Sequence, residues 1–233
     1  MDGFVGAPVS ADTAGAATLV VFDCFGTLVT ERRPMPEPPE FTRWVVDTLA
    51  VDPRLAGEVV ESVFTTLYEA VLDKSALQPA TLGLVDKALR ERGVARPQED
   101  LHRALWFALG CADGDRYELC GPAAQAATRV AGAGRTVRLM SNCYLPGTLM
   151  RRLLRGLGAP EVFDRELFTA DGGPKKPDAR AFELIGSGPF QRRIMVGDSP
   201  DNDIAPARRL GWDTVQVDPR RPDFSELYAL LGM

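Results

Sequence analysis

The segment Val20-Val21-Phe22-Asp23-Cys24-Phe25-Gly26-Thr27 decides the fold of this 233-residue chain. Its apolar start is typical of a strand that is buried on both faces, and the run ends abruptly in an acid, a glycine and a hydroxyl residue. In open parallel sheets, functional side chains lie at the carboxyl ends of the buried strands. We therefore expect Asp23 at the edge of a parallel sheet.

Three later segments complete the pattern. Val137-Arg138-Leu139-Met140-Ser141-Asn142 and Ile194-Met195-Val196-Gly197-Asp198-Ser199-Pro200-Asp201-Asn202-Asp203 both begin as apolar runs and end in polar or acidic residues. Lys175-Lys176-Pro177-Asp178 lies between them in the chain. Because the carboxyl ends of parallel strands meet at one edge of a sheet, the four segments predict a single site.

The residue types in these segments suit phosphoryl transfer. A carboxylate at Asp23 can attack phosphorus or an electrophilic carbon and form a covalent intermediate. Ser141, the ammonium of Lys176 and backbone N–H groups after the first strand would hold the transferring group and offset its negative charge. Asp198 and Asp203 would bind a hard divalent cation together with Asp23, and Mg²⁺ suits such a set of oxygens.

The order and spacing of the four segments resemble the haloacid dehalogenase superfamily of aspartate-nucleophile hydrolases, from about Leu19 to Pro219. The resemblance implies an α/β fold, with a Rossmann-like parallel sheet in three α/β/α layers and an inserted α-helical cap domain. It also implies that Mg²⁺ takes the backbone carbonyl two residues after the nucleophile, here that of Phe25. The roles carried over are the nucleophile on Asp23, phosphoryl-positioning hydroxyls on Thr27 and Ser141, substrate binding by Ser141, Asn142 and Lys176, and metal binding by Asp23, Asp198 and Asp203.

Phe25 departs from the phosphatase pattern of that superfamily. Its phosphatases carry a second Asp there, which protonates the leaving alcohol and later activates water, and such acid–base help is worth about 10²–10⁴ in rate. The haloacid dehalogenases proper carry a Tyr there, but they lack the Gly-Asp pair that this chain retains as Gly197-Asp198. We expect a Mg²⁺-dependent phosphatase acting on a small phosphorylated metabolite. The alternatives are a carbon–halogen hydrolase and a non-hydrolytic protein that binds a phosphorylated ligand.

The spacing of apolar residues changes along the chain and predicts the domain organisation. Residues 1–17 read as a flexible lead-in, 18–33 and 114–233 as the core, and 34–113 as the cap. Apolar residues at three- and four-residue spacing predict cap helices near 39–50, 53–73, 81–92 and 97–110. In the core we expect helices near 122–132, 146–157, 177–186, 203–210 and 223–231, and further strands near 166–170 and 213–217.

Several cap residues have two possible roles. An apolar substrate pocket could be lined by the aromatic residues Trp44, Phe64, Tyr68, Trp106 and Phe107. Core packing is favoured for most of them, because a four-helix cap needs an apolar core of its own. The sole histidine, His102, is expected to be a surface or packing residue, since the implied mechanism needs none. A Schiff base on Lys74 or Lys87 is disfavoured.

Composition bounds the remaining possibilities. Hydrophobic residues make up 45% of the chain and charged residues 25%, which is ordinary globular usage. A net charge of −5 gives no electrostatic reason to expect nucleic acid. No apolar run approaches a membrane span, and the four cysteines lack metal-ligand spacing. We expect a cytoplasmic monomer or homodimer that acts on a small molecule, without nucleic acid or membrane.

Overall fold

The core is built on a five-stranded parallel sheet. The computed structural model describes residues 18–34, 37–75 and 77–233, so the lead-in expected at 1–17 lies outside the described residues. The strands are β1 (Thr18–Asp23), β4 (Thr136–Ser141), β5 (Phe163–Phe168), β6 (Arg192–Gly197) and β7 (Asp213–Gln216), in the order β5-β4-β1-β6-β7. All neighbouring pairs are parallel, and β1 is central. The prediction of a Rossmann-like α/β core is confirmed.

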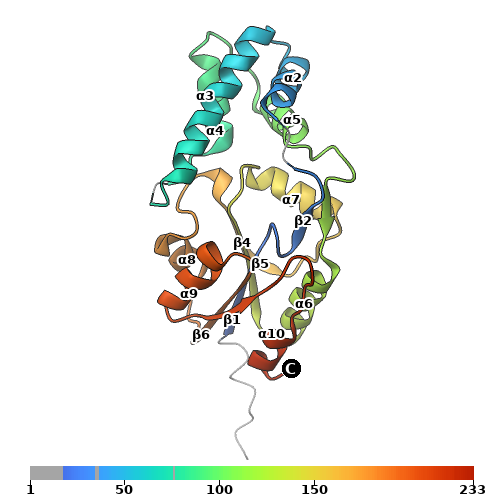
Figure 1. The fold of residues 1–233 in the computed structure, drawn as a ribbon, viewed down its shortest axis with the longest axis vertical. Helices are drawn as coiled ribbons and strands as arrows, with labels where there is room; N and C mark the ends of the chain where they lie inside the picture. The colour runs from blue at the N-terminus through green and yellow to red at the C-terminus, as the bar shows by residue number, and fades with distance from the viewer. Residues whose placement is uncertain (1–17, 35–36, 76) are drawn as a thin grey trace, which may run out of the picture.

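Helices cover both faces of the sheet. They are α6 (Gly121–Gly132), α7 (Gly147–Gly156), α8 (Ala179–Ile185), α9 (Ala205–Arg209) and α10 (Ser225–Leu231). Because side chains alternate along a strand, Val20 and Phe22 of β1 pack with α6, α7 and α10, whereas Leu19 and Val21 pack with α8 and α9. Figure 1 shows α8 and α9 on one side of the sheet and α6 and α10 on the other. The three-layer arrangement is confirmed.

Two predicted boundaries in the core were wrong. The strand expected near 166–170 runs over Phe163–Phe168, and Thr169–Asp171 form a 3₁₀ turn, η1. This strand lies at the edge of the sheet and carries exposed charged residues, so it has no apolar run to mark its start. The helix expected near 203–210 begins earlier, as a π-helical turn η2 (Pro200–Ile204) that continues into α9.

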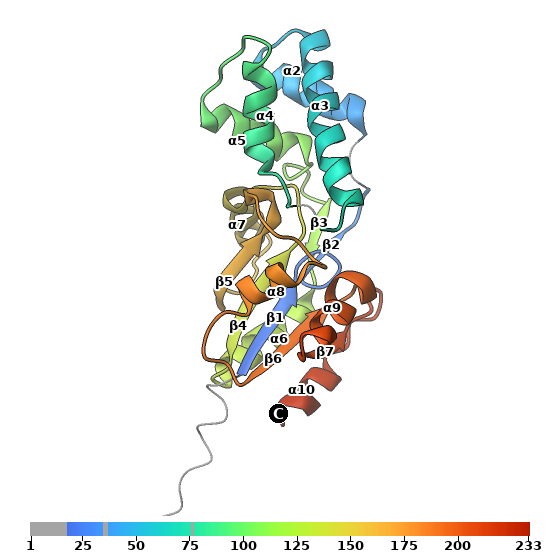
Figure 2. The same ribbon diagram turned by 90° about the vertical axis from the view of Figure 1, so that its left-hand side faces the viewer.

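Four helices form a separate layer beyond the carboxyl ends of the strands (Figures 1 and 2). They are α2 (Pro38–Leu49), α3 (Pro53–Leu72), α4 (Thr81–Arg90) and α5 (Gln98–Ala108). Both α2 and α3 begin with proline, which suits the first helical position because its missing N–H would have no helical partner. The buried side chains of each helix recur every three or four residues and face the other helices. Among the described residues, no helix combines the length and apolar character needed to cross a membrane.

A two-stranded antiparallel ribbon, which the sequence did not predict, links the core to the cap. It pairs β2 (Val29–Glu31) with β3 (Tyr117–Leu119). Just beyond it, the N–H of Arg32 donates to the carbonyl of Arg116 at 2.7 Å. The buried guanidinium of Arg116 in turn donates to the carbonyl of Pro34 and to Asp113. The outgoing and returning chains of the cap are therefore held together where they leave the core.

A second cap–core contact lies on the loop between α3 and α4. Gln78 and Gly173 exchange two backbone hydrogen bonds of 2.7 and 3.0 Å. Lys175 Nζ donates to the carbonyl of Asp73 at 2.9 Å, and Arg180 donates to the carbonyl of Ser75 at 3.0 Å. This loop of the cap thus rests on the segment that carries Lys176.

Candidate active site

Asp23 closes the central strand and is buried against a lysine. It pairs in register with Met140 of β4, so Ser141 is the next residue along the neighbouring strand. Lys176 Nζ donates to Asp23 Oδ1 and, at 2.6 Å, to Asp203 Oδ1. All three charged side chains are buried. The first, third and fourth sequence segments therefore meet in one ionic cluster.

The charges in this cluster perturb one another. Burial raises the pKa of Asp23 from 3.8 to about 7, with Asp203 adding to the rise and Lys176 opposing it. Burial by itself would lower the pKa of Lys176, but the carboxylates of Asp23 and Asp203 outweigh it and raise the pKa above its usual range. Lys176 therefore carries a positive charge at neutral pH and stabilises the carboxylate form of Asp23.

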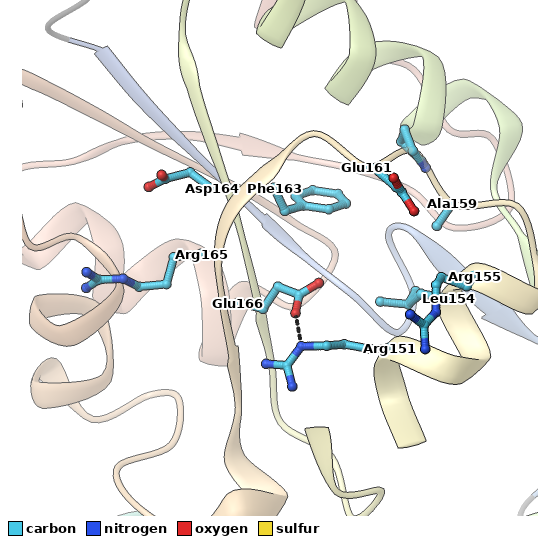
Figure 3. A pocket seen from close by; sticks show the side chains of 10 residues that line it. Arg151, Leu154, Arg155, Ala159, Glu161, Phe163, Asp164, Arg165 and Glu166 are labelled. Atoms are coloured by element: carbon cyan, nitrogen blue, oxygen red, sulfur yellow. Dashed lines mark hydrogen bonds and ion pairs between the residues drawn. The ribbon is translucent and has the colours of Figure 1, made fainter. Parts of the chain in front are cut away.

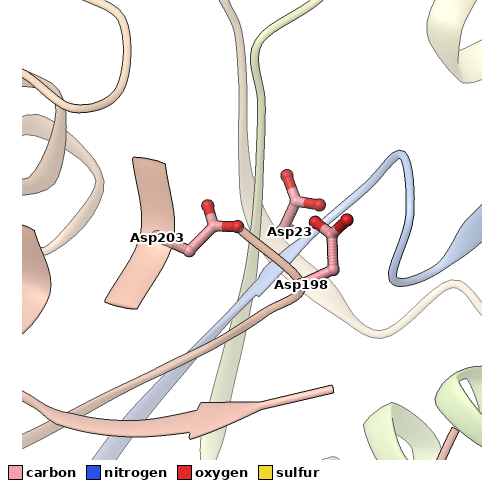
Figure 4. Close-up of side chains that lie close together, drawn as sticks. All are labelled: Asp23, Asp198 and Asp203. Atoms are coloured by element: carbon pink, nitrogen blue, oxygen red, sulfur yellow. The ribbon is translucent and has the colours of Figure 1, made fainter. Parts of the chain in front are cut away.

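A third carboxylate lies beside these two. Asp23, Asp198 and Asp203 offer oxygens that all lie within 4.8 Å of one another (Figure 4). The pKa of Asp198 is raised, first by burial and then by Asp203. The second oxygen of Asp203 accepts the N–H of Ser199 at 3.0 Å, which fixes this carboxylate at the start of η2. With all three acids ionised, they and Lys176 carry a net charge of −3 + 1 = −2, which suits a divalent cation.

Two glycines let the backbone approach these acids. Gly26 has φ +89°, and a Cβ there would lie 2.4 Å from Asp198 Oδ2. At Gly197 a Cβ would lie 2.5 Å from Cγ of Asp203. Glycine is therefore required at both positions for steric reasons, and at Gly26 also for its backbone conformation.

Three buried polar atoms of the site lack a hydrogen-bond partner within the described part of the chain. Asp23 Oδ2, Thr27 Oγ1 and Ser141 Oγ make no hydrogen bond to the described residues, and the thiols of Cys24 and Cys143 lie beside Ser141. Ser141 has no exposed surface at all. Because buried polar groups in folded proteins are almost always paired, three orphaned atoms on site residues are typical of a place that a ligand completes.

Asn142 holds the lysine loop in place. Its amide nitrogen donates to the carbonyl of Lys176 at 2.8 Å, and its amide oxygen accepts the Lys176 N–H at 3.0 Å. The side chain is thus committed to the protein, and it orients Lys176. Binding of substrate by Asn142 stays a prediction.

Phe25 lies on the cap side of the nucleophile. The amides of Thr27, Leu28 and Val29 all donate to the carbonyl of Cys24, and none of these bonds uses the carbonyl of Phe25. The ring of Phe25 packs on Tyr117 of the ribbon, with centroids 5.9 Å apart. Both rings line a cavity of about 180 Å³ that also touches Asn142 and Tyr144. At the position where phosphatases of the superfamily carry their second Asp, this chain therefore has an aromatic ring that lines a cavity.

The sequence model of the haloacid dehalogenase-like hydrolases matches residues 17–211. The chain belongs to this family. No match was found among curated proteins.

Solved structures of the same fold support the assignment of architecture. A 2-haloacid dehalogenase from Pseudomonas syringae pv. Tomato DC3000 is 20% identical, with a TM-score of 0.56 and 87% of each chain covered. The putative HAD-hydrolase YfnB from Bacillus subtilis, solved with magnesium, is 17% identical with a TM-score of 0.52, covering 93% of this chain and 99% of that one. A HAD phosphatase from Thermococcus onnurineus is 18% identical with a TM-score of 0.50, covering 92% and 98%. Dehalogenases and phosphatases thus share the fold of this haloacid dehalogenase-like hydrolase.

Three residues beside the site of this hydrolase were not predicted. Gln78, Tyr144 and Lys175 line a cavity of about 310 Å³ together with Asn142 and Lys176. Lys175 is the first residue of the third segment, but nothing in the sequence shows that its side chain is buried. Gln78 reaches the site only because its loop pairs with Gly173, a contact that no local pattern reveals.

The aromatic residues of the cap divide between packing against neighbouring side chains and lining a cavity. Trp44 stacks on Phe107 with centroids 4.9 Å apart, and Trp106 packs under Arg152 of α7. Phe64 and Tyr68, in contrast, line an apolar cavity of about 250 Å³.

Of the remaining candidates, His102 and Lys87 lie outside the site, whereas Lys74 lines the cavity beside Lys176. His102 is bonded to the carbonyl of Gln98 and to Thr148, so it joins α5 to α7. Lys87 is exposed and pairs with Glu91. Lys74 is also exposed and lines the cavity of about 310 Å³ beside Lys176, which we call the polar cavity.

Another hollow lies away from the motif residues. It has a volume of about 480 Å³ and surrounds the bond between Arg151 and Glu166 at the β5 edge of the sheet (Figure 3). None of the predicted site residues lines it. Its size therefore does not make it a rival to the site at Asp23.

Proposed function

We propose that this protein is a Mg²⁺-dependent hydrolase that uses Asp23 as its nucleophile and acts on a small phosphorylated metabolite. The observation that carries the proposal is the set of orphaned buried atoms, Asp23 Oδ2, Thr27 Oγ1 and Ser141 Oγ, beside a buried ammonium. An oxygen-rich anion would satisfy the two hydroxyls, and its phosphorus would then lie next to the nucleophile.

The residues present fit a magnesium ion. Asp23 Oδ2 has no partner, Asp198 and Asp203 lie beside it, and the local charge of −2 is not balanced by the described side chains of the cluster. Asp23, Asp198, Asp203 and the backbone carbonyl of Phe25 would hold the ion. Bound Mg²⁺ would supply positive charge next to the transferring group.

The chain's own residues account for the two steps. The Asp23 carboxylate attacks phosphorus, and the bond from phosphorus to the leaving group breaks, with its electron pair going to the leaving group. Thr27 and Ser141 donate to the phosphoryl oxygens, and Lys176 offsets their charge. Water then attacks the phosphorus of the aspartyl phosphate, and the bond from phosphorus to Asp23 breaks with its electron pair going to the carboxylate. Both protons of the water leave with the product as dihydrogen phosphate.

Phe25 restricts the leaving group. A phenyl ring cannot donate a proton, so an alkoxide would have to leave unassisted. Acyl, aryl and anomeric phosphates release groups that depart without protonation. We therefore propose that the substrate belongs to one of these classes.

A carbon–halogen hydrolase is the second candidate, because an aromatic ring next to the nucleophile suits halide departure and Phe25 packs there on Tyr117. In that reaction Asp23 would attack carbon, and halide would leave without a proton. The retained Asp198 weighs against this candidate, because it adds a third carboxylate that halide displacement does not need.

The test is a substrate panel assayed with Mg²⁺ and with a chelator. It contains 4-nitrophenyl phosphate, acetyl phosphate, glycerol 3-phosphate and 2-chloropropionate. We expect turnover of the first two only with Mg²⁺, and slow turnover of glycerol 3-phosphate. Chelator-resistant release of chloride would favour the second candidate, and no turnover of any compound would favour a non-hydrolytic binding protein.

We further propose the division into a cap of residues 34–113 and a core of 18–33 and 114–233. The four helices of the cap pack on one another, and both connections to the core are joined at Arg116, which supports this division. We also propose a cytoplasmic monomer or homodimer that acts on a small molecule without nucleic acid or membrane. The net charge of −5 supports the absence of nucleic acid.

A further inference from the structure

The cap of this protein carries a partly open apolar cavity of about 250 Å³. Its walls come from all four cap helices and from Tyr144 of the core, with Phe64, Leu67 and Leu105 among the lining residues. None of the nine residues that line it is charged. A dry apolar cavity of about 150 Å³ is large enough to bind benzene, so this one has room for an aromatic ring with a few further atoms.

The cavity adjoins the candidate active site through a shared wall. Tyr144 follows the second motif by three residues and lines the apolar cavity, the polar cavity beside Lys176 and the cavity beside Phe25. Leu109 likewise lines both the apolar cavity and the one beside Phe25. The apolar cavity is therefore a neighbour of both cavities at the candidate active site.

Three lining residues carry a hydroxyl, Tyr68, Thr81 and Tyr144, and that of Thr81 is buried without a partner among the described residues. Thr81 as a whole is only 2% exposed. A buried hydroxyl without a partner is costly, and an occupant with a single polar atom would relieve that cost. A polyhydroxylated occupant such as a sugar would instead leave several of its own hydroxyls unpaired in these walls.

We propose that the cap cavity binds an uncharged aryl group of the substrate, joined to the phosphoryl group at Asp23 directly or through an acyl carbon. The inference rests on the proposed function and narrows it. Phe25 allows only leaving groups that depart without protonation, and the cavity accepts only an apolar body. Aryl phosphates and aromatic acyl phosphates meet both conditions.

The test compares two non-hydrolysable probes, phenylphosphonate and methylphosphonate, by calorimetric titration of the full chain with Mg²⁺. We expect the phenyl compound to bind about tenfold more tightly or better, because even one extra methylene in an apolar pocket is worth roughly 10–200-fold. Equal affinities would overturn the inference and leave the phosphoryl site standing. If neither probe binds, both the inference and the proposed function fail.

Two variants locate the preference. Leu67→Phe fills the cavity and should abolish the preference for phenylphosphonate, whereas Leu72→Phe makes the same change at an exposed position of the same helix and should retain it. Thr81→Val keeps the shape but removes the unpaired hydroxyl, so phenylphosphonate should bind a few-fold more tightly. Thr128→Val on α6, whose hydroxyl bonds to the carbonyl of Ala124, is its control.

The outcomes stay separable if a variant fails to fold. Should thermal melting show that Leu67→Phe is unfolded, Thr81→Val decides the question alone. A folded Leu67→Phe that keeps the full phenyl preference, or a Thr81→Val that leaves the affinity unchanged, would mean that the ring binds elsewhere and would overturn the inference.

Discussion

The edge of the sheet and the interior of the cap differ in what holds them together. At the sheet edge, three carboxylates and one buried lysine, from three chain segments, are crowded together. In the cap, the cavity is lined mostly by apolar side chains, with one buried unpaired hydroxyl. The first region has the chemistry to make and break a bond, and the second has only shape and apolar surface. We therefore expect reaction type and substrate choice to depend on different regions of this protein and to respond separately to substitution.

The largest effect is expected from Asp23→Asn, which removes the nucleophile and leaves the cap intact. Turnover of 4-nitrophenyl phosphate should fall by about 10⁴-fold or more, as for other residues that form the covalent bond. Phenylphosphonate binding should be largely kept, because the cap cavity is unchanged. Steady-state assays and calorimetry on this variant and on Asp47→Asn, an exposed change on α2, measure both properties. Wild-type turnover in Asp23→Asn would remove this residue from its role.

Phe25→Asp should change the reaction on the core side in the opposite direction. A carboxylic acid at this position can protonate a leaving alkoxide, so hydrolysis of glycerol 3-phosphate should rise by up to about 10²–10⁴. Dependence of the rate on leaving-group pKa should become flatter. Phe25→Leu, which is apolar and cannot donate a proton, is the matched control. A wild-type enzyme that already cleaves alkyl phosphates as fast as aryl phosphates would show that another group supplies the proton.

Asp198→Asn should weaken the response to magnesium. A ligand that binds only the folded state raises the melting temperature. We expect Mg²⁺ to stabilise the wild type and to stabilise this variant much less, with activity reduced by roughly 10²-fold. Asp201→Asn, in the same loop but outside the three-carboxylate cluster, should keep the wild-type shift. Identical shifts in both variants would exclude Asp198 as a ligand.

The smallest expected effect is a pH dependence of magnesium affinity. The pKa of Asp23 in the metal-free protein is raised to about 7, so its proton is retained below that pH and must leave before a cation can bind. Affinity should therefore rise by about tenfold from pH 6 to pH 8 and level off above it. Calorimetric titration at a series of pH values measures this. An affinity independent of pH over that range would mean that Asp23 is already ionised at pH 6.

The sequence predicted the sheet edge better than the cap for a physical reason. Asp23, Ser141 and Asp198 each follow an apolar strand, so a local pattern marks them, and the fold that brings their strands together is confirmed. Their chemical roles remain predictions until they are tested. The boundaries of β5 were wrong because its exposed, charged residues hide an edge strand.

Other features depend on contacts between distant parts of the chain. The strands β2 and β3 are each only three residues long, which is too short for an alternation of apolar and polar residues to be recognised. Gln78 reaches the polar cavity through its pairing with Gly173, and Phe64 faces a cavity while Trp44 stacks on a neighbour. Helical periodicity marks a buried face, but it does not distinguish a wall of a cavity from a filled core.

The central claim is that Asp23 forms a bond to phosphorus in the presence of magnesium. Beryllium fluoride mimics a phosphoryl group and bonds to a nucleophilic carboxylate. A crystal structure of the full chain, crystallised with Mg²⁺ and beryllium fluoride, therefore tests this claim most directly. The account predicts a beryllium–oxygen bond to Asp23, with the fluorides near Thr27, Ser141 and Lys176, and no adduct when magnesium is removed. An adduct on another residue, or one on Asp23 that forms equally well in chelator, would contradict it.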